Sequence, residues 1–282
     1  MHLYNKNIKI RETLIEHPEF IIANDSKNRT PLHCAVELLG KSTNLTTIEI
    51  LNFDNLLNIP AINYEGITPL HCAFDQKKED QCLELLQSLI NTSKNIKGKK
   101  FEVKFDLSLQ SYQGKNALHY FAENHKPKKK SVNFKTTSQN KNRALQIFNF
   151  LIENSGNKEE KLHALRMVDC VGNTPLHSLL LNVEFCKICP TEIVKEFGSN
   201  IYRDGIIQNN QGFTALHCFV SLYDYKENKL NKDFNFFEHN VKYNWNFSFL
   251  DPLINNEILK VQSSNGNTIV SSNFFFFFFN QK

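Results

Sequence analysis

One four-residue stretch recurs along the chain and decides its fold: Thr30-Pro31-Leu32-His33, Thr68-Pro69-Leu70-His71 and Thr174-Pro175-Leu176-His177. Looser copies are Asn116-Ala117-Leu118-His119 and Thr214-Ala215-Leu216-His217. A threonine followed by proline indicates a helix start, because the hydroxyl can accept a hydrogen bond from a free backbone N–H and proline fits the first helical position. We therefore predict five helices that begin in the same way.

A glycine stands two residues before most of these copies, at Gly66, Gly114, Gly172 and Gly212. Glycine at a fixed place before a helix is typical of a tight turn that needs a positive φ angle. Each repeating unit is therefore predicted to be a turn followed by a helix.

Two copies, Thr30 to Ala35 and Thr68 to Ala73, keep the full T-P-L-H-x-A motif, and in this the chain resembles the ankyrin-repeat family. The resemblance implies an all-α fold: an ankyrin-repeat solenoid of stacked helix-turn-helix units with β-turn fingers. The motif histidines lie 38, 48, 58 and 40 residues apart, more than the family period of about 33. Long insertions are therefore expected, and a stack of units can carry them in loops.

A single array is predicted, which we divide into four parts. Residues 1–223 form the ankyrin-repeat array, a half repeat plus five repeats, of which the fifth continues beyond an insert. The following parts are an aromatic insert at 224–248, an outer helix with a degenerate repeat at 249–273, and a low-complexity phenylalanine tail at 274–282. The chain stops where another inner helix is expected, so a truncated larger protein is a second interpretation.

Apolar periodicity and the turn signals set the expected helices. Their ranges are 8–22, 31–39, 47–52, 69–76, 79–89, 117–124, 143–153, 191–197 and 215–223, with a further inner helix from 174 and a polar loop at 125–141.

The composition is that of a folded protein: 282 residues, 41% hydrophobic, with a net charge of +4. The N-terminus is polar and no stretch reaches the 18 or so apolar residues of a membrane span, so we expect a soluble protein. The seven cysteines, an odd number, suit a reducing compartment. We therefore predict cytoplasmic localisation, or delivery into a host cytosol if the protein is an effector of an intracellular microbe, as its A+T-rich residue bias suggests.

No pattern in the chain predicts catalysis, a cofactor or a metal site. Three motif histidines precede a cysteine, but adjacent helical residues point in different directions. The family resemblance implies instead that each histidine bonds a turn backbone and joins neighbouring units. Cys186 and Cys189 have the spacing of half a zinc site, yet no second pair exists, so we interpret them as packing residues. The protein is predicted not to be an enzyme.

A basic block runs from Lys126 to Arg143 without any acidic residue. It can be a solvated loop or can contact phosphate groups or an acidic protein surface. The candidates for an anionic partner are Lys126, Lys128, Lys129 and Lys130. Nucleic acid is not the expected partner.

The predicted function is that of a protein-interaction scaffold. It is expected to bind a partner protein on a concave face made of finger tips and inner helices. The chain is expected to be monomeric. Two alternatives stay open: a fragment of a larger ankyrin-containing enzyme, and a basic-loop adaptor for phosphate-bearing partners. The predicted contact residues are Lys27, Arg29, Tyr64, Glu65, Tyr112, Gln113, Val171, Asn173, Asn210, Gln211 and Phe213.

Overall fold

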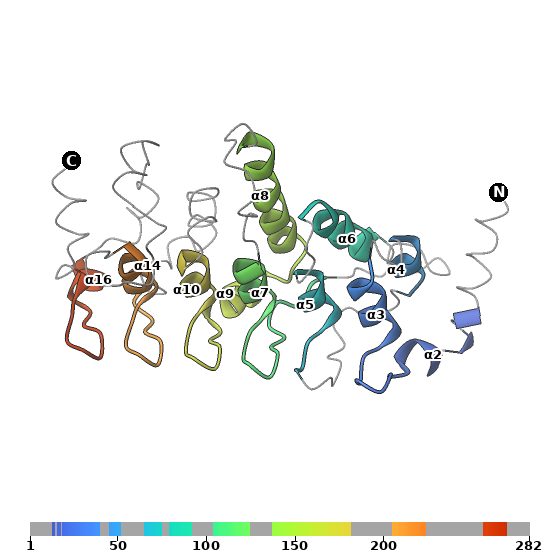
Figure 1. The fold of residues 1–282 in the computed structure, drawn as a ribbon, viewed down its shortest axis with the longest axis horizontal. Helices are drawn as coiled ribbons and strands as arrows, with labels where there is room; N and C mark the ends of the chain where they lie inside the picture. The colour runs from blue at the N-terminus through green and yellow to red at the C-terminus, as the bar shows by residue number, and fades with distance from the viewer. Residues whose placement is uncertain are drawn as a thin grey trace. The chain divides into compact units, whose positions relative to one another are not determined.

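A computed structural model of the chain contains a series of repeated helices, which correspond to the predicted repeat units (Figure 1). The structure describes residues 13–14, 16–17, 19–39, 45–51, 65–74, 79–91, 104–124, 137–181, 205–223 and 256–269. The described helices are α2 (Glu19–Ile22), α3 (Pro31–Glu37), α4 (Leu45–Leu51), α5 (Pro69–Phe74), α6 (Glu79–Asn91), α7 (Ala117–Asn124), α8 (Thr137–Glu153), α9 (Lys158–Arg166), α10 (Pro175–Leu181), α14 (Ala215–Tyr223) and α16 (Asn256–Lys260). Within these ranges β structure is limited to isolated bridges, so the predicted all-α class is confirmed.

The T-P-L-H motif starts its helices through the expected cap. The Thr30 hydroxyl accepts a hydrogen bond from the His33 N–H at 3.5 Å, and Pro31 occupies the first turn of α3. Thr214 caps α14 in the same way, at 3.3 Å from the His217 nitrogen. At the third copy Asn116 replaces threonine, and its side-chain oxygen lies 3.3 Å from the His119 nitrogen. A short side-chain oxygen is sufficient for this role.

The chain forms two compact units. The first comprises residues 1–124 and 146–164, and the second comprises residues 125–145 and 165–282. Each unit has repeats of its own.

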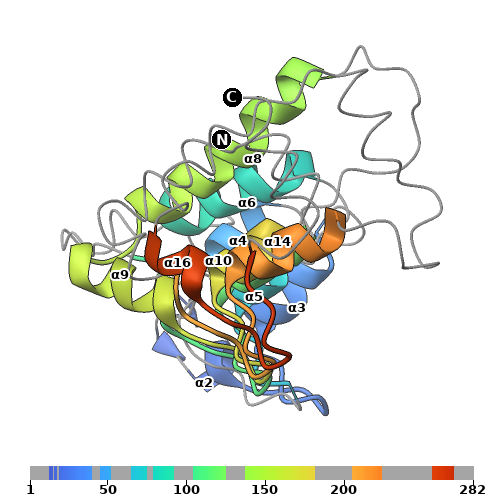
Figure 2. The same cartoon turned by 90° about the vertical axis from the view of Figure 1, so that its left-hand side faces the viewer.

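In the first unit the inner helices pack in sequence, α3 against α5 and α5 against α7. The outer helices α4 and α6 pack together on one side of them, while the turns before α3 and α7 project on the other side (Figure 2). Phe121 lies at the centre of the core, fully buried, with its ring centroid 5.9 Å from that of Phe74 and 6.0 Å from that of Phe148. Large apolar side chains from consecutive repeats therefore form one continuous core.

In the second unit α10 packs against α14 through buried leucine, alanine and phenylalanine side chains. The turns before α10 and α14 and the turn after α16 lie in a row (Figure 1). Antiparallel bridges close the last two turns, between Gln208 and Thr214 and between Gln262 and Thr268. The degenerate last repeat predicted at 249–273 therefore contains a regular finger turn.

Three outer helices differ from the prediction. The helix predicted over 8–22 is interrupted at His17, and α2 begins only at Glu19. Helix α8 begins at Thr137, six residues before the predicted start, so part of the expected polar loop is helical. Helix α9 lies in a stretch to which no helix was assigned. Its N-terminus is closed by a capping box: the Asn157 side chain accepts the N–H groups of Glu159 and Glu160, at 2.9 and 3.0 Å, and the Glu160 carboxylate accepts the Asn157 N–H at 2.7 Å.

Candidate functional site

The finger turns share one five-residue design. We number their positions one to five in six fingers: 25–29, 63–67 (described from Glu65), 111–115, 169–173, 209–213 and 263–267. In fingers 1, 4 and 5 the first side chain holds the turn closed. In finger 4, the Asp169 carboxylate accepts the N–H groups of Val171 and Asn173 at 2.9 and 2.8 Å. Asp25 and Asn209 do the same in fingers 1 and 5. A short acceptor at position one therefore fixes these three turns. In fingers 3 and 6 the hydroxyls of Ser111 and Ser263 do not bond the turn, and backbone hydrogen bonds close it.

Position four needs a left-handed backbone, with φ between 56° and 82° in all six fingers. It is occupied by glycine in five fingers and by Asn28 in finger 1. Asparagine is among the few other residues that adopt this conformation readily. The glycine predicted from the sequence is thus a conformational requirement of the turn.

Neighbouring fingers are joined by a backbone hydrogen bond that recurs at the same positions. The N–H of position two donates to the carbonyl of position three in the preceding finger. These bonds run from Tyr112 to Glu65 (2.9 Å), from Asn210 to Val171 (2.9 Å) and from Ser264 to Gln211 (3.3 Å). We call this series the finger ladder. It holds the fingers at a fixed register within each unit.

The ladder leaves the side chains of positions two and three exposed to solvent. Tyr112, at position two of finger 3, is 65% exposed, and Val171, at position three of finger 4, is 43% exposed. The other predicted contact residues at these positions are also exposed: Lys27, Glu65, Gln113, Asn210 and Gln211. The structure therefore places these seven predicted residues on the finger tips.

The predicted residues at position five are half-buried and have partners inside the fold. Arg29 forms ion pairs with Asp25 and Glu37. Asn173 accepts a hydrogen bond from the Asn209 side chain at 2.9 Å. The Phe213 carbonyl contacts His177. Because the sequence does not show where a side chain points, it could not separate these positions from the exposed tips.

An ion pair between position five and the inner helix recurs in the first unit. Arg29 reaches Glu37 near the end of α3, and Lys115 lies 2.7 Å from Glu123, which is likewise eight residues further along, in α7. Hydrogen bonds from the Arg29 side chain lower the pKa of Asp25 to about 2. The finger face of the first unit is therefore lined by fixed charges of both signs.

Two motif histidines, His33 and His177, bond the backbone of the next finger, as the family resemblance implied. The His33 ring bonds the Thr30 hydroxyl through Nδ1 at 2.7 Å and the Ile67 carbonyl of the next finger through Nε2 at 2.9 Å. His177 contacts the Phe213 carbonyl at 3.0 Å in the same way. His33 and His177 therefore join one repeat to the next finger through Nε2, whereas the buried Nε2 atoms of His71 and His217 form no hydrogen bond to the described residues.

The buried histidines predict a loss of stability in mild acid. Burial lowers the pKa of His71 to about 4, and it also lowers the pKa values of His33 and His217. In the unfolded chain these histidine rings take up a proton near pH 6.5. The stability that the neutral buried rings contribute is therefore complete above pH 6.5 and is lost as the pH falls towards 4. For His71 alone the loss is on the order of 3 kcal/mol. Urea unfolding between pH 7 and pH 4.5 measures it.

The matched variants for this experiment are His71→Gln and His163→Gln, because His163 is exposed on α9. His71→Gln should make the free energy of unfolding depend less steeply on pH, and His163→Gln should leave this dependence unchanged. An equally steep dependence in His71→Gln would contradict the assignment to His71. Asp25 does not interfere, because its carboxylate titrates below the histidine range.

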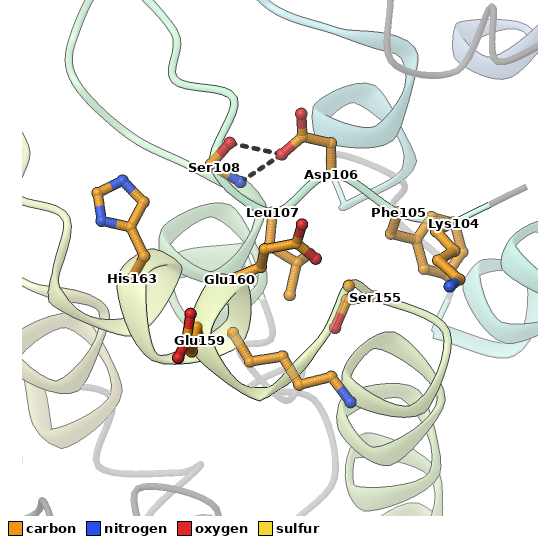
Figure 3. A pocket seen from close by; sticks show the side chains of 11 residues that line it. Lys104, Phe105, Asp106, Leu107, Ser108, Ser155, Glu159, Glu160 and His163 are labelled. Atoms are coloured by element: carbon orange, nitrogen blue, oxygen red, sulfur yellow. Dashed lines mark hydrogen bonds between the residues drawn. The ribbon is translucent and has the colours of Figure 1, made fainter.

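A pocket of about 550 Å³ lies in the first unit, between the segment 104–108 and the start of α9 (Figure 3). Its base includes the buried residues Leu107 and Ser155. Two of its carboxylates are used locally, since Asp106 accepts hydrogen bonds from Ser108 and Glu160 caps Asn157. This pocket is not predicted from the sequence, because α9 is not predicted. The Asn157–Glu160 capping box is the sequence signal that indicates the start of this helix.

Several predicted sites lie outside the described residues. These are Tyr64, the basic residues Lys126, Lys128, Lys129 and Lys130, the Cys186–Cys189 pair, the aromatic insert and the phenylalanine tail. Within the described part, no group of three or more His, Cys, Asp or Glu side chains is arranged to hold a metal ion. The described helices are each too short or too polar to cross a membrane.

Comparisons with known proteins give a structural likeness. No family model matches the chain, and no curated protein matches it. Among solved structures, it is similar to the ankyrin repeat domain of Bcl-3, described as a unique member of the IkappaB protein family, with a TM-score of 0.54 and 15% identity over 93% of this chain and 85% of that chain. The ankyrin repeat protein EF0377 gives a TM-score of 0.45 and 16% identity over 83% of this chain and 87% of that chain. The likeness to the Bcl-3 domain, together with the capped T-P-L-H helices and the finger turns, shows that this chain has the ankyrin-repeat fold.

Proposed function

We propose that the chain is a protein-interaction module that binds a partner protein through its finger tips and the exposed ends of its inner helices. The observation that carries the proposal is the exposure of positions two and three on turns that the finger ladder holds in place. Side chains on a fixed backbone lose little conformational entropy on binding, so even a modest contact area can give useful affinity.

The tip residues of the first unit have the chemistry of a recognition surface. Tyr112 is a large exposed aromatic side chain, and its ring lies over Gly66, where an added Cβ would come within 2.9 Å of it. Lys27 and Glu65 are exposed charges at position three of neighbouring fingers. Tyrosine is enriched among residues that dominate binding energy, and exposed charges steer partners. We propose that these three side chains contact the partner.

Affinity capture followed by mass spectrometry tests this surface. The triple variant Lys27→Glu, Glu65→Lys, Tyr112→Ala should capture at least tenfold less of the partner than the unchanged chain does. The control is Glu84→Lys with Gln87→Glu, two exposed positions on the outer helix α6, which should capture the partner normally. Surface changes of this kind alter stability by only about 0.5 kcal/mol each. Equal capture by the triple variant would refute the proposed finger surface.

Three further expectations belong to this proposal. The partner is a protein and not a nucleic acid, the chain acts as a monomer, and it works in a cytosol, including that of a host cell if it is an effector. They rest on the sequence interpretation and are tested by the identity of the captured partner and by the compartment in which capture succeeds.

A further inference from the structure

The finger face of the second unit is almost free of charge. In the described segments 167–181, 205–219 and 261–269, which form its fingers and the inner helices α10 and α14, Asp169 is the one charged residue; Arg166 and the exposed Lys260 directly precede the first and the last of these segments. Its side chain is buried and accepts two N–H groups of its own turn. The chain as a whole has 22% charged residues, so this composition is a local property of the face.

The difference appears at equivalent positions of the two units. In fingers 1 and 3 of the first unit, position five pairs with a glutamate eight residues later, as Arg29 does with Glu37 and Lys115 with Glu123. In finger 4 the corresponding residues are Asn173 and Leu181, and Leu181 is 39% exposed. The charged pair is thus replaced by an amide and an exposed aliphatic side chain.

Position three changes in the same direction. Lys27, Glu65 and Gln113 occupy it in the first unit, two of them charged, whereas the uncharged residues Val171, Gln211 and Asn265 occupy it in fingers 4, 5 and 6. The ladder bonds from Asn210 to Val171 and from Ser264 to Gln211 place these three residues on consecutive fingers. All three are exposed, so they form a row with one apolar and two amide side chains.

We infer that this row binds an extended, uncharged segment of the partner protein, composed of serine, threonine, asparagine or glutamine with aliphatic residues. The inference rests on the proposed function and names the chemistry of its partner at the second unit. Amide side chains both donate and accept hydrogen bonds, so Gln211 and Asn265 can pair with peptide groups, hydroxyls and amides. Val171 and Leu181 offer apolar contact.

A charged partner segment is disfavoured on this face for a physical reason. Binding would remove water from the charge, and within the described segments 167–181, 205–219 and 261–269 this face offers no exposed charge with which to compensate that loss. An uncharged segment loses less hydration and can satisfy its polar groups with the amides. Affinity for it should also depend little on salt, since salt screens interactions between charges.

The test is selection of a phage-displayed library of random peptides on the full chain. Enriched peptides should include a class without Asp, Glu, Lys or Arg. The dissociation constant of these peptides for the chain, measured by fluorescence anisotropy, should change less than twofold between low and high salt. The variant Gln211→Glu should weaken this class at least tenfold. The matched control is Gln113→Glu, which alters an exposed glutamine at position three of finger 3 in the first unit, and it should bind these peptides normally.

Each other result overturns the inference in a distinguishable way. If the enriched peptides are charged and respond to Lys27 and Glu65 but not to Gln211, the uncharged row is wrong while the proposed function stands. If uncharged peptides bind but Gln211→Glu leaves their affinity unchanged, the row is also wrong. If selection yields no peptide and partner capture responds to no finger variant, both the inference and the proposed function fail.

Discussion

Replacing Phe121 with alanine is expected to lower the free energy of unfolding by about 4 kcal/mol. The ring is fully buried between Phe74 and Phe148, with centroid distances near 6 Å. Truncation removes both aromatic contacts and leaves a cavity that rigid helices on either side cannot close. Urea unfolding followed by far-ultraviolet circular dichroism measures the change.

The control for Phe121→Ala is Phe20→Ala in α2. Phe20 is 58% exposed, so its loss should change stability by no more than about 0.5 kcal/mol. A loss below about 1 kcal/mol in Phe121→Ala would show that the three rings do not form the joint core described above. The comparison separates a packing effect from the general removal of an aromatic side chain.

Gly212→Ala is expected to destabilise the protein by about 3 kcal/mol, whereas Gly266→Ala is expected to cost about 1 kcal/mol. Both glycines occupy position four, with φ angles of 74° and 77°, so alanine pays the same left-handed conformational cost at each. At Gly212 the added Cβ would also lie 2.5 Å from the backbone nitrogen of Ser264. That nitrogen donates the ladder bond to Gln211 and cannot move away without weakening it.

At Gly266 an added Cβ meets no atom of the described residues within 4 Å. The pair therefore isolates the contribution of finger-to-finger contact from that of backbone conformation. Thermal and urea unfolding of both variants provide the measurement. Equal destabilisation would mean that position four selects glycine for its φ angle alone and that the close approach of Ser264 has no energetic weight.

The inner helices and fingers could be predicted because each depends on residues close together in sequence. The Thr30 cap bonds a nitrogen three residues away, and Gly212 adopts its positive φ within its own turn. The all-α fold class was predicted correctly for this reason, whereas the bonds of His33 and His177 to the next finger join residues more than 30 positions apart and were implied by the family resemblance alone. Helix α7 was predicted with the bounds it has, whereas α9, outside the repeated motif, was missed.

The candidate surface was only partly predictable, because it depends on pairings between distant residues. The sequence treats Lys27 and Arg29 as equivalent basic turn residues. The structure separates them: Lys27 is exposed at position three, while Arg29 is bound to Asp25 and Glu37. Likewise, the replacement of a charged pair on the finger face of the second unit becomes visible only when Leu181 is aligned with Glu37 and Glu123 by their positions in the repeats.

The finger ladder has a consequence for how such a chain can grow. Each joint uses only the N–H of position two and the carbonyl of position three, and main-chain groups are the same whatever the side chain. A finger can therefore accept any neighbour of the same design, however many residues intervene. The side chains at the tips can diversify and the linking segments can lengthen. The bond between neighbouring fingers is formed by main-chain atoms, so it does not depend on the side chains that selection changes.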